Sequence, residues 1–315
     1  MKKDMINSTH IEGILYSHNL VSKVTGDTSK NPGTSYINGT IDIATDDAHT
    51  NVVSIHFSYV TPTYSKSGKD NPNYSILNKI ITGEIKTVAD AGWEGAARLR
   101  VDSAIGLNEF YSDRDGEPTL VSTKRNEGGF VHLMRPTDVL DSNEKNRSTF
   151  KADMVITSVT VREADPEKDT PETCVVKGCI FDFRKAILPV EFTATHPGAI
   201  NYFVSLDASP KSPIFTTVWG VQTASTVKRT ITEESAFGDP SIREVTTSRR
   251  EFVITGAKAE VYEWDSEDTI AASELKDLMS EREIYLATLK KNQDEWKAKA
   301  AEAKATPVGT SEFAF

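Results

Sequence analysis

The sequence INGTID at residues 37–42, followed by VSIHF at residues 53–57, has a counterpart in VKGCIF at residues 176–181, followed by LPVEF at residues 188–192. In each half a glycine lies in the middle of an apolar alternation, and the two glycines are 139 residues apart. A glycine inside a strand lets a sheet coil sharply, because it has no Cβ to resist the bend. The shared order of the segments indicates duplication of one β module of roughly 120 residues.

Strand-like sequence extends from about residue 10 to residue 254, with short runs rich in Val, Ile, Thr, Phe and Tyr broken by Gly, Pro, Asn or Asp. Residues 73–89 differ, because apolar side chains recur there at a spacing of three to four. That spacing predicts a short helix capped near Asn71 and Pro72. After Trp264 the sequence is rich in Ala, Glu, Lys and Leu and contains no Gly or Pro until Pro307, which predicts one long helix.

These changes in composition divide the chain into four parts. We predict a first β module over residues 1–150, a second over 151–262, a C-terminal helix over 263–305 and a flexible tail over 306–315. Leu275, Leu278, Tyr285, Leu289 and Trp296 form an apolar seam along the helix, and this seam is expected to dock on the β body or on another copy of the chain.

Length and charge exclude several classes of protein. The chain has 315 residues and a net charge of -10, which argues against a nonspecific coater of duplex DNA, since such proteins usually carry a large basic face. No apolar run approaches the ~18 residues of a membrane span, and the first residues lack a signal-peptide pattern. We therefore expect a cytoplasmic protein without membrane contact. The two cysteines, Cys174 and Cys179, are expected to be reduced thiols on opposite faces of one strand.

The β pattern resembles a known family. HIEGIL at residues 10–15, with residues 37–41 and 53–57, looks like the first three strands of an OB-fold. From residue 10 to residue 255 the chain resembles phage-type single-stranded-DNA-binding proteins with two OB-folds in tandem. The resemblance implies a mostly β protein, with two OB-like β-barrel modules and a long C-terminal α-helix. It also implies a protein of the host cytoplasm that coats and protects single-stranded DNA during replication or recombination, largely without sequence preference.

Such a function needs flat side chains on which bases stack and cations that follow the phosphates along one groove. The segment from Tyr59 to Lys69 is the strongest candidate, because an aromatic and basic loop with Pro and Gly could cover a strand of DNA. Phe57, Phe130 and Phe192 follow strand alternation and are predicted to be core. The predicted nucleic-acid-binding residues are His56, Tyr59, Tyr64, Lys66, Lys69, Tyr74, Arg98, Arg100, Tyr111, Lys124, Arg125, Lys211, Trp219, Lys228, Arg229, Arg249 and Arg250.

The C-terminal tail offers a second kind of contact. Phe313 and Phe315 are candidate partner-binding residues, through which replication or recombination proteins could be recruited. The alternative is a frayed terminus with two incidental aromatics. Cellular single-strand-binding proteins end in a dense acidic run, whereas Glu312 is the one acid among the last ten residues here, which puts competition of the tail with DNA in doubt.

No catalytic motif stands out. The histidines show no metal-binding pair, and there is no phosphate-binding glycine loop, nucleophile elbow or dinucleotide fingerprint, so we expect no enzyme, cofactor or metal. The alternative function is a virion structural or assembly protein whose β domains oligomerise through the C-terminal helix. The sequence leaves a homo-oligomer open under either function.

Overall fold

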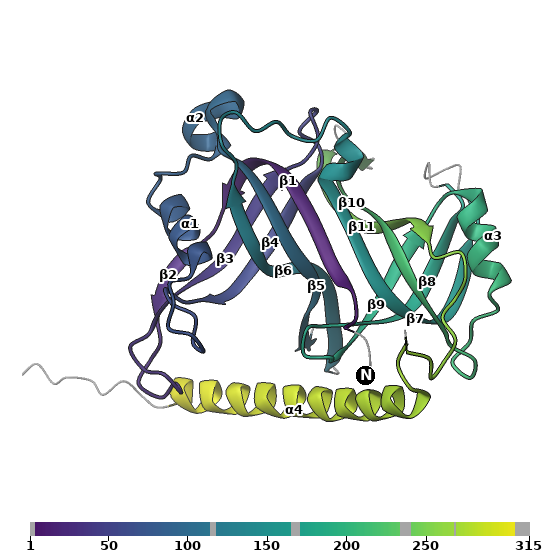
Figure 1. Cartoon of the computed structure of the whole chain (residues 1–315). Helices are drawn as coiled ribbons and strands as arrows, with labels where there is room; N and C mark the ends of the chain where they lie inside the picture. Colours follow the sequence, from purple (N-terminus) through teal and green to yellow (C-terminus); the bar gives the residue numbers. More distant parts are fainter. Residues whose placement is uncertain (1–3, 114–117, 165–170, 234–240, 268, 306–315) are drawn as a thin grey trace, which may run out of the picture.

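The computed structural model describes residues 4–113, 118–164, 171–233, 241–267 and 269–305; for residues 225–233, 241–249 and 299–305 it describes the backbone alone. These residues form one eleven-stranded sheet with helices at its margins (Figure 1). The elements are β1 (Asn7–His18), β2 (Val21–Val24), β3 (Ser35–Ala44), β4 (Val52–Val60), α1 (Pro72–Ile81), α2 (Val88–Gly95), β5 (Arg98–Ser112), β6 (Thr119–Leu133), the 3-10 helix η1 (Glu144–Arg147), β7 (Ser148–Arg162), β8 (Thr173–Phe181), β9 (Ile187–Ala194), α3 (Pro197–Ser205), β10 (Ile214–Glu233), β11 (Ser241–Ala257) and α4 (Ala272–Ala305).

The strands of the first half close on themselves. β1 pairs with β3 and β5, β3 pairs with β4, and β6 joins β5 to β4, the last pairing being parallel. We call this circuit the first ring. Helices α1 and α2 lie between β4 and β5 in the chain and pack at the outer edge of the ring (Figure 1).

The second half repeats the same circuit, the second ring. β7 pairs with β8 and β10, β8 pairs with β9, and β11 joins β10 to β9 in parallel. Helix α3 stands between its third and fourth strands, as α1 and α2 do in the first ring. Asn71 caps α1 and His196 caps α3, each followed by a proline in the first turn. The order of elements predicted from the repeated sequence is therefore present in both halves.

Two strand glycines permit close approaches between backbone segments in the rings. A Cβ on Gly178 would lie 1.9 Å from the carbonyl oxygen of Val155, so β8 can cross β7 only because the residue there is glycine. Gly39 has a φ of +135° and approaches the Asn19 carbonyl in the same way. These two glycines explain why the repeated sequence motif is centred on them.

Each ring encloses its own apolar core. Ile41, Ile55 and Phe57 are among the buried residues of the first, and Phe150, Phe192 and Phe252 stack inside the second. β1 pairs with β7 and joins the rings into one sheet. Cys174 lies in the core of the second ring and Cys179 in a separate cluster outside it, as the prediction of opposite faces requires. Burial raises the pKa of the Cys179 thiol to about 12.

Two long ribbons extend from the rings. β5 and β6 continue pairing over residues 104–112 and 119–127, beyond the part of β5 that pairs with β1; this is the first ribbon. β10 and β11 continue over residues 222–233 and 241–252, beyond the pairing of β10 with β7; this is the second ribbon. Ile105 and Leu107 of the first ribbon pack against the core of the second ring, so the two halves also share apolar contacts.

Helix α4 lies beneath both rings and connects the second ring to the first ribbon (Figure 1). Ile270, Leu275 and Leu278 pack with Phe181 and Phe215 at its beginning. Further along, three side chains of the helix contact the end of the first ribbon: Arg282 pairs with Glu109, Gln293 accepts from the Tyr111 amide at 2.8 Å, and Lys297 pairs with Asp113. The Arg282 and Glu109 side chains are 11% and 3% exposed, so this ion pair is a buried anchor.

The structure revises several details of the sequence analysis. The helix begins at Ala272 rather than near residue 263, and Tyr262, Trp264 and Ile270, which lie between β11 and the helix, pack into the body. β7 begins at Ser148, so the second ring starts shortly before residue 151. Trp296 of the predicted seam is 70% exposed, since the helix contacts the body at few points. The 306–315 tail, with Phe313 and Phe315, lies outside the described residues. Within the described chain, no helix is long and apolar enough to cross a membrane.

Candidate nucleic-acid interface

The outer surface of β3 and β4 carries exposed aromatic rings. Along β4, Ile55 and Phe57 point into the first ring, and His56 between them faces outward. Strict alternation would place Tyr59 on the inward side with Phe57, but a register shift between Phe57 and Val60 turns Tyr59 outward. Tyr59 is 47% exposed, and its ring packs against that of Tyr36 on β3 with centroids 4.7 Å apart and planes inclined by 37°. One face of the pair is thus supported by protein while another remains open, which is the arrangement that a stacking base requires.

β6 continues this surface. Phe130, predicted to be core, is instead 61% exposed, because a register shift in β6 between Glu127 and Phe130 turns the ring outward. Asn73 of α1 donates to the Gly129 carbonyl at 2.6 Å and accepts from the Val131 amide at 3.0 Å. These bonds hold the start of α1, and the loop that precedes it, against the strand that carries Phe130.

That loop is the predicted aromatic and basic segment. It leaves β4 after Val60 and reaches the helix cap at Asn71, with Tyr64, Lys66 and Lys69 exposed along it. An antiparallel bridge between residues 63 and 70 closes the loop on itself. Tyr74 follows in α1 and is half-buried against the core of the first ring, so it supports the loop rather than standing free. We call Tyr36, Tyr59, Phe130 and this loop the aromatic face.

A basic cleft opens beside the aromatic face, where the bases of the two ribbons meet. Its volume is about 170 Å³, and it brings together His56 from β4, Lys124 and Arg125 from β6, and Arg250 from β11. Four residues predicted from separate parts of the sequence therefore line one cavity. Arg250 is exposed and forms no ion pair with any residue that the structure describes.

The charges in the basic cleft are partly restrained. The Lys124 ammonium donates to the Glu191 carbonyl and lies 5.7 Å and 5.8 Å from the ring centroids of Phe192 and Phe252. Burial lowers the pKa of Lys124, and the nearby carboxylates of Glu191 and Glu251 oppose that shift. The ammonium is therefore held at the end of the second ring, facing the space between the two halves.

The remaining groups include polar atoms without partners. Burial, reinforced by the positive charge of Arg125, lowers the pKa of His56, so its imidazole is neutral near pH ~7. Arg125 pairs with Glu127 at 2.9 Å through its terminal nitrogen. The atoms His56 Nδ1, Arg125 Nε and Asn126 Oδ1 are buried and form no hydrogen bond. Unsatisfied buried groups are uncommon in proteins, and three beside one cleft call for a physical reason.

The walls of the basic cleft are fixed by amide side chains. Asn126 Nδ2 donates to Gln222 Oε1 at 2.8 Å and to the Ser54 carbonyl at 3.2 Å. Asn51 donates to the Gln222 carbonyl at 3.2 Å and accepts from the Ala224 amide at 2.6 Å. The bonds to Gln222 and Ala224 cross between the two halves and hold the facing walls of the cleft together. The sequence analysis missed these amides, because isolated Asn and Gln residues carry no pattern.

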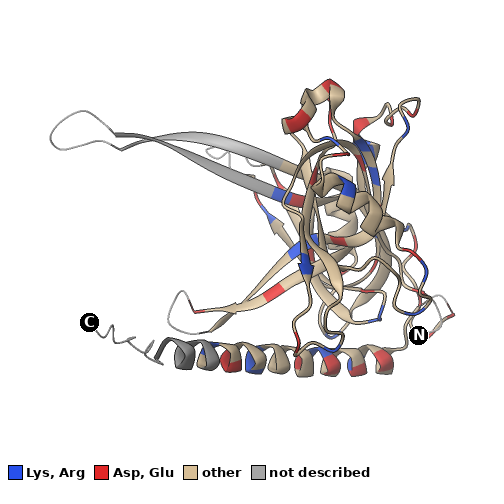
Figure 2. Cartoon of the chain, turned by 90° about the vertical axis from the view of Figure 1, so that its left-hand side faces the viewer, with Lys and Arg blue, Asp and Glu red and all other residues tan. Residues whose placement is uncertain are grey.

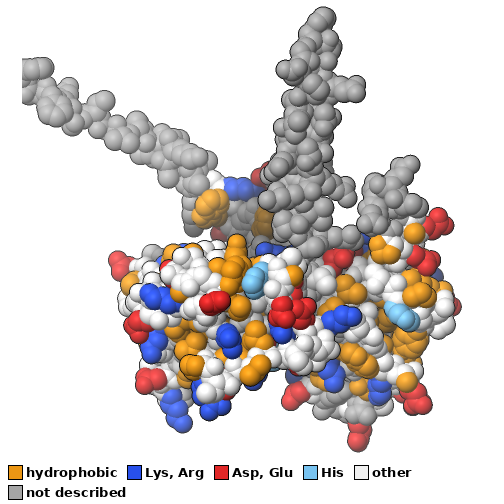
Figure 3. Space-filling model, turned by 90° about the horizontal axis from the view of Figure 1, so that it is seen from above, with side chains coloured by type: hydrophobic (Ala, Val, Ile, Leu, Met, Phe, Trp, Pro, Cys, Tyr) orange, Lys and Arg blue, Asp and Glu red, His pale blue; other side chains and the backbone are white. Residues whose placement is uncertain are grey.

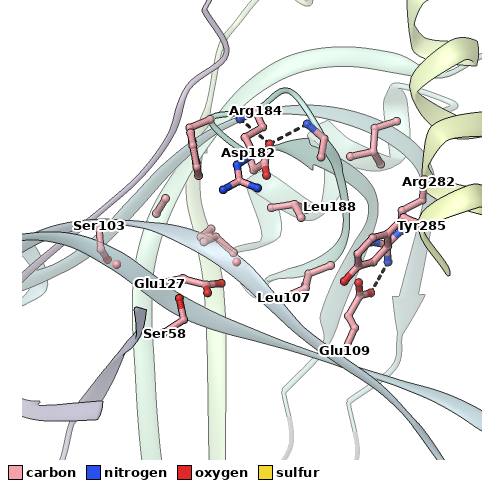
Figure 4. A pocket seen from close by; sticks show the side chains of 18 of the residues that line it. Ser58, Ser103, Leu107, Glu109, Glu127, Asp182, Arg184, Leu188, Arg282 and Tyr285 are labelled. Carbon is pink, nitrogen blue, oxygen red and sulfur yellow. Dashed lines mark hydrogen bonds and ion pairs between the residues drawn. The ribbon is translucent and has the colours of Figure 1, made fainter. Parts of the chain in front are cut away.

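A second, larger cleft lies between the first ribbon, the β8–β9 turn and α4 (Figure 4). Its volume is about 950 Å³, and Phe183, Tyr285 and Leu107 are among its lining residues. Figure 4 shows the Glu109–Arg282 pair at its edge, with Leu107 and Leu188 pointing into the space. The charged lining residues are Asp102, Glu109, Glu127, Asp182 and Glu281 against Arg184 and Arg282. Carboxylates outnumber cations here, which disfavours a phosphate backbone.

On the face seen from above, the described Lys and Arg side chains lie among Asp and Glu side chains over both halves (Figure 3). Residues of both charge signs also occur along α4 (Figure 2). Trp219 is 40% exposed on β10, next to Lys151 of β7, in a groove of about 600 Å³ that also contains His10 and Asp102. The net charge of -10 is thus spread over the surface, and the basic cleft is a local exception.

The family model described as YorF matches residues 6–292. The chain belongs to the YorF family. No curated protein matches the sequence. Among solved structures, a deletion mutant of the single-stranded DNA binding protein from Thermus aquaticus is similar, with 10% identity and a TM-score of 0.45 over 84% of this chain and 99% of that one. A similarity at this level does not establish a shared function.

In this member of the YorF family, the predicted binding residues with described side chains divide into those near the aromatic face and basic cleft and those elsewhere. His56, Tyr59, Lys124, Arg125 and Arg250 meet at the aromatic face and the basic cleft, with the loop of Tyr64, Lys66 and Lys69 beside them. Lys228, Arg229 and Arg249 lie on the strands of the second ribbon, where their side chains are not described. Tyr36 belongs to the aromatic face but was missed, because it stands alone at the start of a strand.

The second group lies elsewhere in this YorF-family chain. Arg100 pairs at 2.7 Å with Glu12, which is buried, so its charge is used within the first ring. Arg98 donates to the Asp138 carbonyl, and Tyr111 lies under α4. Lys211 is exposed in the turn before β10, and Trp219 faces its own groove. The structure does not bring these five residues to the basic cleft.

Proposed function

We propose that the protein binds single-stranded DNA and coats it largely without sequence preference. The observation that carries the proposal is that β4 contributes both the exposed Tyr59 of the aromatic face and His56 of the basic cleft. Open tyrosine and phenylalanine rings supply base stacking, and the exposed Lys66, Lys69 and Arg250 supply charge for the phosphates. The surface is narrow, which suits a flexible single strand better than a rigid duplex.

We further propose that each ring is an OB-type barrel and that the chain carries two of them in tandem. The strand circuit, the parallel closing pair and the helix after the third strand support this interpretation in both halves. The aromatic face then occupies the surface of the second and third barrel strands, which in OB-folds binds oligonucleotides. A role in phage-type replication or recombination, with partners recruited through the tail, is part of the same proposal.

The assembly alternative has no specific support from the contacts of α4. The helix packs through Leu275 and Leu278 into its own chain and pairs with the first ribbon through Arg282. The contacts described for α4 are therefore with its own chain.

A fluorescent oligo-dT tests the proposal directly. We expect saturable binding at low salt that weakens steeply as salt increases, and much weaker binding of a duplex of the same length. A dissociation constant weaker than about 10 µM for oligo-dT at low salt would remove single-stranded DNA binding as the function.

A further inference from the structure

We propose that the basic cleft receives the hydrogen-bonding edge of one unstacked nucleobase, so that affinity depends on base identity at that position. The inference rests on the proposed binding of single-stranded DNA and adds a base-reading element to it. Its evidence is the set of three buried atoms without partners, His56 Nδ1, Arg125 Nε and Asn126 Oδ1, which belong to residues lining the same small cavity.

The three atoms include both kinds of hydrogen-bonding group. Arg125 Nε can only donate. Asn126 Oδ1 must be an acceptor, because the Nδ2 of the same amide is committed to the Ser54 carbonyl, which cannot donate. The neutral His56 ring can present Nδ1 as either. A base edge combines donors and acceptors in the same plane, whereas a phosphate offers acceptors alone and would leave the Asn126 oxygen unsatisfied.

The size of the cleft agrees with a single base. A volume of about 170 Å³ is well below the ~300–1,000 Å³ of sites that hold drug-sized ligands, and a strand of several nucleotides cannot enter it. The aromatic face next to it would hold neighbouring bases by stacking. One base would thus be turned into the cleft, as proteins commonly do when they recognise unpaired nucleotides.

The existing contacts of these residues leave the three atoms uncommitted. Arg125 bonds to Glu127 through a terminal nitrogen, so that bond does not use Nε. Asn126 bonds to Ser54 and Gln222 through Nδ2, so those bonds keep the cleft wall in place without using Oδ1. A base edge that enters the cleft can therefore bond to these atoms without breaking an existing hydrogen bond.

The test compares the affinities of oligo-dT, oligo-dC and oligo-dA of equal length for the full chain and three variants. Arg125→Lys keeps the charge but removes the Nε donor, and His56→Phe keeps a flat ring but removes Nδ1. Tyr59→Ala is the matched control, because it removes stacking outside the cleft. The readout is the ratio of the tightest to the weakest affinity, which the self-stacking of a given oligonucleotide affects equally in every variant.

For the unaltered protein we expect a ratio of about tenfold. Arg125→Lys and His56→Phe should each lower the ratio to about threefold or less, while Tyr59→Ala weakens binding of all three and preserves the ratio. Equal affinities of the unaltered protein for the three oligonucleotides would overturn base reading and leave DNA binding intact. A ratio that is unchanged in both cleft variants would do the same. Failure to bind any of the three would instead remove the proposed function.

Discussion

Replacement of Tyr59 by alanine should weaken binding of oligo-dT by about tenfold to thirtyfold. One base stacked on an aromatic side chain is worth ~1–3 kcal/mol, and Tyr59 can offer one face, since the other packs on Tyr36. We therefore take about 1.5–2 kcal/mol, and each 1.4 kcal/mol is about a factor of ten in the dissociation constant. The fold should survive, because the lost aromatic pair contributes only ~0.5–1.5 kcal/mol.

The assay is fluorescence anisotropy of labelled oligo-dT at one fixed salt concentration, with thermal unfolding followed by circular dichroism. Tyr16→Ala is the matched control: Tyr16 is 41% exposed and stacked on Trp93, but it lies on β1 outside the aromatic face. The control should bind as the unaltered protein does. A loss of less than about twofold for Tyr59→Ala, or an equal loss for both variants, would refute stacking at the aromatic face.

Three further predictions concern charge, packing and protonation. Arg250→Gln should reduce the slope of log K against log salt by about 0.7, measured by salt titration of oligo-dT binding; an unchanged slope argues against a phosphate contact. Gly178→Ala should lower the free energy of unfolding in urea by about 3 kcal/mol, because its Cβ would meet a carbonyl 1.9 Å away, whereas Gly26→Ala, with nothing within 4 Å, should change it little; similar losses would contradict the crossing. The pKa of His56 in the folded chain is lower than its usual 6.5. As the pH falls below about 6.5, His56 therefore takes up a proton in the unfolded chain but not in the folded chain, and the free energy of unfolding decreases. Urea midpoints at about pH 7 and about pH 5.5 should therefore differ less in His56→Phe than in the unaltered protein, and an equal difference would show that His56 titrates normally.

The sequence predicted the local features of the fold well. The strand glycines Gly39 and Gly178 mark the bends of both rings, and the Asn71 cap starts α1. Alternation also marked Phe57 and Phe192 as core residues, and both are buried inside their rings. Each of these features depends on a few neighbouring residues, whose spacing fixes which side of a strand a side chain occupies.

The positions of the faces relative to one another could not be predicted in the same way. Arg100 was assigned to the binding surface, but it pairs with Glu12, which is 88 residues away in the chain and adjacent only after β1 and β5 pair. Tyr111 was assigned likewise and is covered by α4. Phe130 followed the alternation of a core residue until a register shift turned it outward. Alternation describes one strand, whereas these outcomes depend on which strands meet.

The central claim is that a single DNA strand lies on the aromatic face and enters the basic cleft. The most direct measurement is photo-crosslinking of an oligonucleotide containing 4-thiothymidine, followed by mass spectrometry of the linked peptides. The account predicts crosslinks to peptides that contain Tyr36, Tyr59 and Phe130, and their loss when excess oligo-dT is added. Crosslinks confined to the peptide of Trp219, in the groove beside Lys151, or to the peptide of Tyr285, in the larger cleft lined by α4, would contradict it.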